Sequence, residues 1–116
     1  MKETEQEIKG SRFESHIDRA TLDVVEVCGI DEGLILSPSR QEHVVVARFF
    51  LYTILRNSGF TWTHIGEMMN RDHGAVYMGY KRLQMRLLCG EKKLSWMRDN
   101  LQERGWIFKE HDPNDI

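Results

Sequence analysis

The amino-acid sequence predicts an all-α protein, a compact bundle of about five to six helices that contains a helix-turn-helix. Apolar residues recur at spacings of three and four in several segments, which is the period of an amphipathic helix. The alternation of apolar and polar residues typical of a half-buried strand is almost absent. The chain has only two prolines, and its glycines punctuate the periodic segments. A single domain of 116 residues can bury most of its apolar surface without disulfides or metals.

The first predicted helix covers about residues 13–28 and ends at Gly29, because glycine favours the left-handed position after a helix. Residues 1–12 are charged and lack apolar periodicity, so we expect a flexible N-terminal tail. Asp31 can cap a single helical turn over residues 34–36. The first third of the chain is therefore predicted to be one helix followed by a short turn.

A loop is predicted over residues 37–40, since Pro38 disfavours helical backbone at the residue before it. A long helix follows over about residues 41–56 and is ended by residues 57–59, Asn-Ser-Gly. Its inward-facing positions are Val44, Ala47, Leu51, Ile54 and Leu55. This apolar face predicts that the helix packs in the core.

Residues 61–89 hold the feature around which the rest of the chain is organised. Thr61 or Thr63 can cap a short helix that runs through Met69. A two-residue break follows, and the Asp72 side chain can then accept from the free backbone N–H groups of a second helix. That second helix has an apolar stripe formed by Val76, Tyr80, Leu83 and Leu87. A short helix, a tight turn and a longer helix with a polar, basic outer face are typical of a helix-turn-helix whose second helix contacts duplex DNA.

A last helix is predicted over about residues 92–104, after a break at Gly90, with Gly105 at its end. The apolar segment 106–108 is expected to fold back on the core, and residues 109–116 to form a flexible C-terminal tail. The domain therefore spans residues 13–108. The three tryptophans are interpreted as core anchors, at Trp62, Trp96 and Trp106.

The net charge of −2 conceals a segregation along the chain. Residues 1–35 hold 4 Lys/Arg and 9 Asp/Glu, a balance of −5, and residues 94–116 hold 3 and 5, a balance of −2. Residues 36–93 hold 9 Lys/Arg and 4 Asp/Glu, a balance of +5. Local potential decides where phosphate binds, so the positive excess around the helix-turn-helix favours a nucleic-acid partner.

Several other classes of protein are disfavoured. Cys28 and Cys89 match no metal or redox spacing and are interpreted as buried thiols in a reducing compartment. No apolar run approaches the ~18 residues of a membrane span, so we expect a cytoplasmic protein with no membrane partner. No catalytic constellation, metal-ligand set or nucleotide loop is present, and we expect neither an enzyme nor a cofactor.

Four pieces of the sequence, in the same order, resemble the C-terminal DNA-binding domain of the bacterial chromosomal replication initiator DnaA. They are Val25-Glu26-Val27-Cys28-Gly29-Ile30, Leu36-Ser37-Pro38-Ser39-Arg40 followed by Arg48, Ile65-Gly66, and Arg71-Asp72-His73 with Val76. The resemblance covers about residues 17–89 and implies a helical fold related to the Trp-repressor helix-turn-helix. It also implies sequence-selective binding of double-stranded DNA, in replication initiation or in transcription regulation. The chain lacks the Gly-x-x-x-x-Gly-Lys-Ser/Thr loop of the initiator's ATPase domain, so the resemblance is to a stand-alone DNA-binding domain.

The resemblance implies three roles. His73 would contact base edges in the major groove, Arg40 would enter the minor groove, and Arg48 would contact the phosphate backbone. A solvated loop is the alternative for Arg40, and an intramolecular pair, for instance with Glu67 or Asp72, is the alternative for Arg48. Asp72 is foremost a cap, worth ~1 kcal/mol, and could also accept from a cytosine amino group.

Positions on the predicted helices suggest the remaining contacts. Gly74 would allow close approach to DNA, although the first turn of a helix also tolerates glycine for its own sake, and Ala75 would contact a thymine methyl. Tyr77 could contact DNA or only cover the helix, and Arg71, Lys81 and Arg82 could contact phosphates or only be solvated. Thr61 and Thr63 could bind a phosphate at a helix N-terminus, although capping alone explains them equally well. The candidate DNA-binding set is Arg40, Arg48, Thr61, Thr63, Arg71, Asp72, His73, Gly74, Ala75, Tyr77, Lys81 and Arg82.

A rival interpretation is a protein-interaction module, acting through a protein partner or self-association, that keeps the fold without binding DNA. The family commonly has two threonines where this chain has Gly74 and Ala75, and a basic loop residue and a glutamine where it has Glu42 and Phe49. Phe49, Tyr77 and Met78 would then form an interface.

Overall fold

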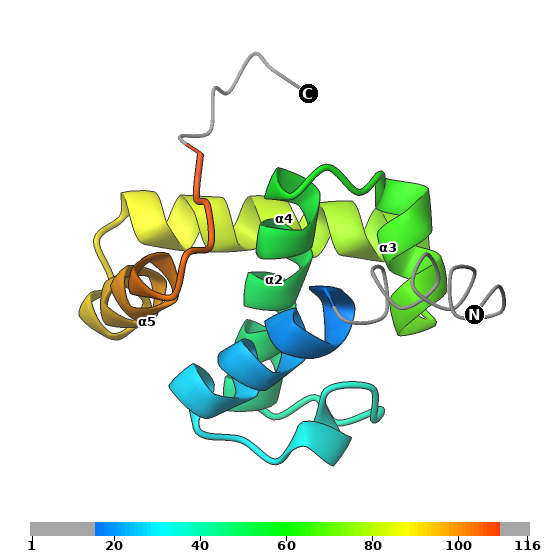
Figure 1. Ribbon diagram of the computed structural model, residues 1–116, viewed down its shortest axis with the longest axis horizontal. Coiled ribbons are helices and arrows are strands. Elements are labelled where there is room, and N and C mark those ends of the chain that lie inside the picture. Colours follow the sequence, from blue (N-terminus) through cyan, green and yellow to red (C-terminus); the bar gives the residue numbers. More distant parts are fainter. Residues whose placement is uncertain (1–15, 110–116) are drawn as a thin grey trace, which may run out of the picture.

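The computed structural model describes residues 16–109, and within this range every regular element is a helix (Figure 1). The elements are a helix over 16–28, η1 (Glu32–Leu34), α2 (Glu42–Asn57), α3 (Trp62–Met69), α4 (His73–Leu88) and α5 (Lys92–Glu103). The predicted all-α helical bundle is thus confirmed. The expected tail at 1–12, the predicted helix start at 13–15, and all but the first residue of the expected tail at 109–116 lie outside the described residues.

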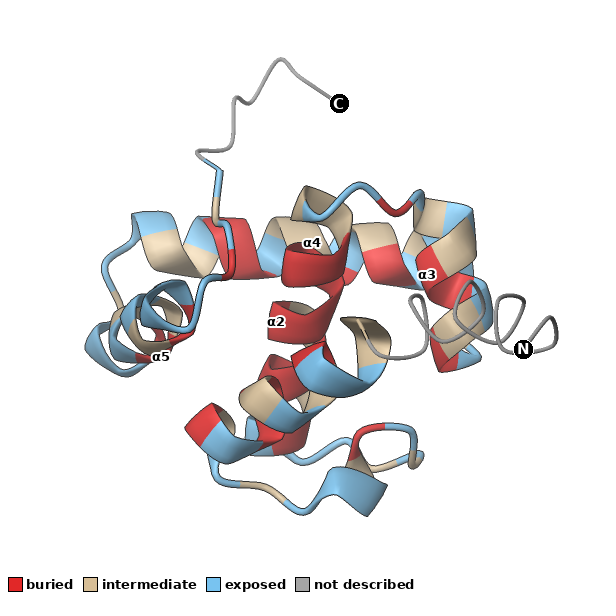
Figure 2. Ribbon diagram, viewed as in Figure 1, coloured by how far each residue is buried: buried red, intermediate tan, exposed pale blue. Residues whose placement is uncertain are grey.

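Helix α2 is the central element of the bundle. The first helix and α4 pack against it, and most of its surface is buried (Figure 2). All five inward positions predicted from its sequence are buried, including fully enclosed Val44, Ala47, Ile54 and Leu55. The helix therefore fixes the positions of the elements that surround it.

Helix α4 packs against α2 at Gly79, which is buried. A Cβ atom at Gly79 would lie 2.7 Å from Cδ1 of Phe49 and 2.9 Å from Cδ2 of Tyr52. Glycine in a helix costs about 1 kcal/mol relative to alanine. Here the missing side chain lets the two aromatic rings of α2 pack against the backbone of α4.

The helix ends follow the local signals in the sequence. Gly29, Gly90 and Gly105 have φ angles of +69°, +77° and +98°, the left-handed region expected after a helix. Asp31 precedes a single helical turn as predicted, but the turn is η1 at residues 32–34 and not at 34–36, and the Asp31 side chain accepts no capping hydrogen bond. Instead its backbone carbonyl accepts from the N–H of Leu34 at 2.9 Å.

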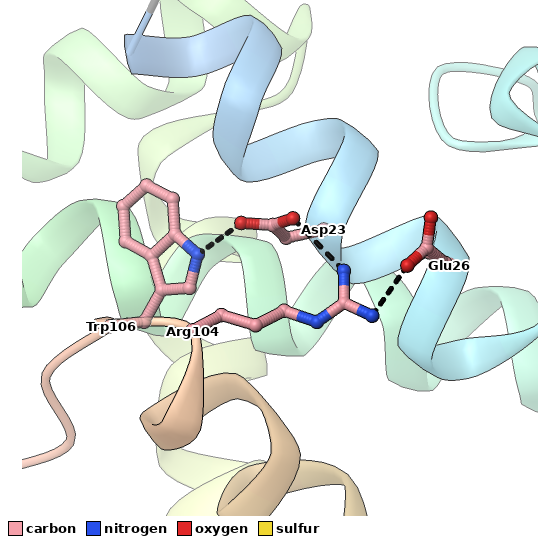
Figure 3. Close-up of polar contacts among 4 residues, drawn as sticks. All are labelled: Asp23, Glu26, Arg104 and Trp106. Carbon is pink, nitrogen blue, oxygen red and sulfur yellow. Dashed lines mark hydrogen bonds and ion pairs between the residues drawn. The ribbon is translucent and has the colours of Figure 1, made fainter.

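The segment after α5 folds back onto the first helix (Figure 3). Nε1 of Trp106 donates to Oδ2 of Asp23 at 2.8 Å, and Arg104 pairs with both Asp23 and Glu26. The ring of Phe108 lies 6.0 Å from that of Phe50 on α2. The predicted return is confirmed for Trp106 and Phe108, whereas Ile107 is exposed.

Two expectations about buried side chains were wrong. Trp96 is 57% exposed because it lies off the stripe through which α5 packs on the core. Cys89 is exposed at the end of α4, and only Cys28 is partly buried, with its Sγ 3.9 Å from Sδ of Met97. Within residues 16–109, no helix has the length and apolar character needed to cross a membrane.

Candidate nucleic-acid interface

The turn between α3 and α4 is built from the predicted caps. Oγ1 of Thr61 accepts from the N–H of His64 at 3.1 Å, and Oδ2 of Asp72 accepts from the N–H of Gly74 at 2.9 Å. Between the two helices Asn70 is left-handed, with φ of +53°. Asparagine tolerates this conformation better than most residues, so the chain reverses within three residues.

Gly66 sets the distance between α3 and the start of α4. A Cβ atom at this position would lie 2.5 Å from the carbonyl oxygen of Arg71 and 3.3 Å from the backbone nitrogen of His73. Both obstacles are backbone atoms, which cannot rotate away. Any larger residue must therefore push the start of α4 outward.

The start of α4 is open to solvent. The side chain of His73 is 67% exposed, and that of Asp72 is also exposed, with its Oδ1 3.9 Å from Nδ1 of His73. Ala75 is exposed as well, while Gly74 is half-buried beneath the Asp72 carboxylate. An open depression of about 410 Å³ lies beside this end, lined by Thr63, Gly66, Glu67, Asn70, Arg71, Asp72 and His73. No other part of the described chain covers the His73 end.

Arg48 is not at the surface. It is 6% exposed on α2, and its guanidinium donates to the backbone carbonyls of the loop between η1 and α2. The acceptors are the carbonyl oxygens of Leu34, Ile35, Ser37 and Ser39, at 3.2, 2.8, 2.5 and 2.7 Å. Burial lowers the pKa of this guanidinium, and the neighbouring charge of Arg71 lowers it further. Arg48 was expected on a surface that faces phosphate, and this expectation was wrong. Its buried guanidinium instead holds the loop through hydrogen bonds to the loop carbonyls.

Arg71 ties the same loop to the helix-turn-helix. Its Nη2 donates to the carbonyl oxygen of Ser37 at 2.8 Å, the oxygen that also accepts from Arg48. Arg71 also interacts with the buried hydroxyl of Tyr52, whose pKa is raised by its burial. The sequence placed Arg71 among the phosphate contacts, and the structure shows it half-buried between the loop and the turn.

Arg40 lies at the end of this anchored loop and is exposed. It forms no hydrogen bond or ion pair with the residues that the structure describes. The loop is further held by the hydroxyls of Ser37 and Ser39, which accept from the N–H groups of Ser39 and Gln41. The backbone that carries Arg40 is thus fixed beside the turn that begins α4.

The outer face of α4 carries the remaining candidates. Arg82 is exposed, and Lys81 lies with its Nζ 5.6 Å from the ring centroid of Tyr77. The ring of Tyr77 also packs edge-on against Trp62 at 5.4 Å, so Tyr77 is half-buried rather than free. Thr61 and Thr63 are both exposed at the start of α3.

Two contributions to this surface were not foreseen. Arg86 pairs with Glu91 at 2.5 Å and with Glu42 at 2.8 Å, which links the end of α4 to the start of α2. The hydrogen bond from Arg86 holds the pKa of Glu91 below its usual range. The other contribution is the carbonyl of Ser37, and no sequence pattern signals a backbone acceptor shared by two distant arginines. The spacing of five residues between Arg86 and Glu91 in the sequence is only weak evidence for an ion pair.

In comparisons with family models, curated proteins and solved structures, this chain matches none of them. Within residues 16–109, no three His, Cys, Asp or Glu side chains come together to form a group that could hold a metal ion.

Proposed function

We propose that this protein binds double-stranded DNA with sequence selectivity, through the start of α4 and the loop that carries Arg40. The observation that carries the proposal is the hydrogen bond from Arg71 to the carbonyl of Ser37. It holds the loop against the turn, so that exposed Arg40 and exposed His73 belong to one rigid unit. The DnaA-like signature at residues 71–73 supports the same function.

The dimensions of α4 suit a major groove. Its 16 residues span about 24 Å at ~1.5 Å per residue, and the groove is ~12 Å wide. The first turns can enter the groove while Val76 and Leu83, both fully buried, stay on the core. His73 then reaches base edges, and Ala75 can touch a thymine methyl.

The charges available to DNA are fewer than the sequence suggested. Arg40 and Arg82 are exposed and unpaired within the described residues, and Lys81 lies over an aromatic ring. In this proposal Arg40 enters a minor groove, where negative potential favours a guanidinium, and Lys81 and Arg82 lie along phosphates. Arg48 and Arg71 support the interface by holding the loop.

The biological role that fits is DNA binding without catalysis, in replication initiation or transcription regulation. The second candidate is an interaction module without DNA binding. The observation that favours it is the exposure of Met78 and Met85 on the outer face of α4.

A salt-titrated binding assay on mixed-sequence duplex DNA separates the two. If about four to six phosphates are neutralised, log K falls against log salt with a slope near −0.9 per phosphate. Arg40→Ala is expected to weaken binding and to reduce the slope by about one contact, whereas His73→Ala mainly weakens binding to preferred sites. Arg98→Ala is the matched control, because Arg98 lies on α5 and pairs with Asp99. An absence of binding at low salt supports the interaction module instead.

A further inference from the structure

A second feature of α4 is an apolar groove along its outer face, where it passes the first half of α2. The groove has a volume of about 590 Å³ and is lined by Glu42, Val45, Phe49, Tyr77, Met78, Lys81, Arg82, Met85 and Arg86. It begins beyond the first turn of α4 but shares Tyr77, Lys81 and Arg82 with the proposed DNA contact.

The floor of the groove is apolar and adaptable. Met78 and Met85 are 47% and 57% exposed, and Phe49 and Tyr77 are half-buried. Methionine is unbranched and polarizable, so a surface rich in methionine fits different apolar side chains. Met78 and Met85 are separated by two turns of helix, about 10 Å along the axis at ~1.5 Å per residue. This length matches two turns of a second helix.

The rim of the groove has an unpaired positive charge on one side. Arg86 is already neutralised, because it pairs with both Glu42 and Glu91. Within residues 16–109, neither Arg82 nor Lys81 forms an ion pair, and Nζ of Lys81 lies 5.6 Å from the ring centroid of Tyr77. An occupant with carboxylates opposite Lys81 and Arg82 would gain complementary charge.

We propose that this groove docks an acidic amphipathic helix from a partner protein. Such a helix would place apolar residues at spacings of i, i+3, i+4 and i+7 against Met78 and Met85. Its acidic flank would face Lys81 and Arg82. Nucleic acid fits the floor less well, because phosphates gain nothing from an apolar surface.

Docking and DNA binding use overlapping residues. Tyr77, Lys81 and Arg82 line the groove and also belong to the proposed DNA contact. A docked helix therefore excludes duplex DNA from α4. This exclusion rests on the proposed function, whereas the docking does not.

The test uses a synthetic helical peptide of about 14 residues, built from alanine, leucine and glutamate with this apolar spacing. The full chain is labelled at the methionine methyl groups and titrated by NMR. Two peptides serve as controls: one has the same composition in scrambled order, and the other has lysine in place of glutamate. The expected result is a saturable shift of the Met78 and Met85 methyl signals, with little change at buried Met69 and Met97.

Variants separate the contributions of charge and apolar contact. Lys81→Glu combined with Arg82→Glu is expected to weaken peptide binding about fivefold to tenfold, because two exposed ion pairs with the peptide are replaced by pairs of like charges. Met85→Ser is expected to weaken it similarly. Leu22→Ser is the matched control, because Leu22 is an equally exposed apolar residue on the first helix. All four positions are at the surface or half-buried, so these variants are expected to fold.

Three results would overturn the docking proposal. They are no shift at Met78 and Met85 with millimolar peptide, equal binding of a control peptide, or methyl shifts that depend on protein concentration alone. The last result would identify a second copy of this chain as the occupant. A competition experiment adds duplex DNA to the complex. If the peptide displaces the DNA, the docked helix excludes DNA from α4. If both bind at once, only this exclusion is wrong and the docking proposal stands. If the protein binds no duplex, the peptide titration still decides the docking.

Discussion

Arg71, in the turn before α4, donates to the carbonyl of Ser37 at 2.8 Å, although the two residues are 34 positions apart in the chain. The same carbonyl accepts from Arg48. Arg48 thus holds the loop that carries Arg40 against α2, and Arg71 holds it against the turn that begins α4. A flexible loop would lose conformational entropy on binding, and this anchoring reduces that loss in advance.

Loss of Arg48 should destabilise the fold and release the loop. Arg48→Met keeps most of the side-chain volume but removes the guanidinium donor from four backbone carbonyls. The carbonyls of Leu34 and Ser37 still accept from Ser37 and Arg71, so the loss falls mainly on those of Ile35 and Ser39. Removing a charged donor from buried partners costs about 1.5–3 kcal/mol. Urea unfolding should show this loss, and amide exchange should be faster over residues 35–41. Unchanged stability and exchange would contradict the role given to Arg48.

Arg71→Ala should separate the loop from the turn at a smaller cost in stability. Arg71 is half-buried, so we expect a loss of about 1 kcal/mol. The distinguishing observation is a change in the NMR signals of both Ser37 and His73, on opposite sides of the lost hydrogen bond. Changes confined to one side would show that the two segments are held together by other contacts.

Gly66→Ala should displace the start of α4. The new Cβ would meet the carbonyl oxygen of Arg71 at 2.5 Å, so the backbone must shift. We expect a loss of about 1–3 kcal/mol in the free energy of unfolding, as for other overpacked sites. Gly33→Ala is the control, because its Cβ would meet only a side-chain oxygen of Asp31 at 3.6 Å. Equal effects of the two changes would show that α3 and α4 pack less tightly than described.

The Asp72 cap can be tested apart from its charge. Asp72→Ala should cost about 1 kcal/mol in the free energy of unfolding, while Asp72→Asn should retain most of it, because asparagine also caps. Thermal unfolding of both variants measures the difference. If the two variants are equally destabilised, the carboxylate acts by charge and not as a cap.

The two thiols should differ in reactivity. Burial raises the pKa of Cys28 to about 12, partly offset by the nearby charge of Lys93, whereas Cys89 is exposed. A thiol reagent at pH 8 should therefore label Cys89 rapidly and Cys28 only after unfolding. Because the folded pKa lies above the ordinary value of 9.0, the contribution of Cys28 to stability is complete below pH 9 and is lost as pH rises toward 12. Fast labelling of both thiols in the folded protein would contradict its burial.

Local signals in the sequence predicted much of this fold. Thr61, Asp72 and the glycines after the helices act on their immediate neighbours, and their positions were predicted within a residue or two. The apolar stripes predicted the core faces for the same reason. Trp96 was wrongly predicted to be buried because tryptophan usually is. It precedes Met97 in the helix and therefore lies off the buried stripe of α5, which is formed by Leu94, Met97 and Leu101.

The candidate site was predicted less completely. Arg40 and His73 are exposed, as the predicted DNA contacts require, but Arg48 is buried. Its partners are backbone carbonyls of a loop, and their position depends on how η1 and α2 pack. The role of Gly79 was also missed, because only the three-dimensional structure shows that the rings of Phe49 and Tyr52 leave no room for a side chain there.

Selection of bound sites from random duplex DNA tests the central proposal most directly. We predict that the wild-type protein enriches one short motif, and that His73→Ala enriches the same motif with one or two positions degenerate, since a lost base contact costs about 1–3 kcal/mol. Arg98→Ala should enrich the unchanged motif. Failure of the wild-type protein to enrich any motif, or an identical motif from His73→Ala, would contradict the assignment of α4 as the helix that contacts the bases.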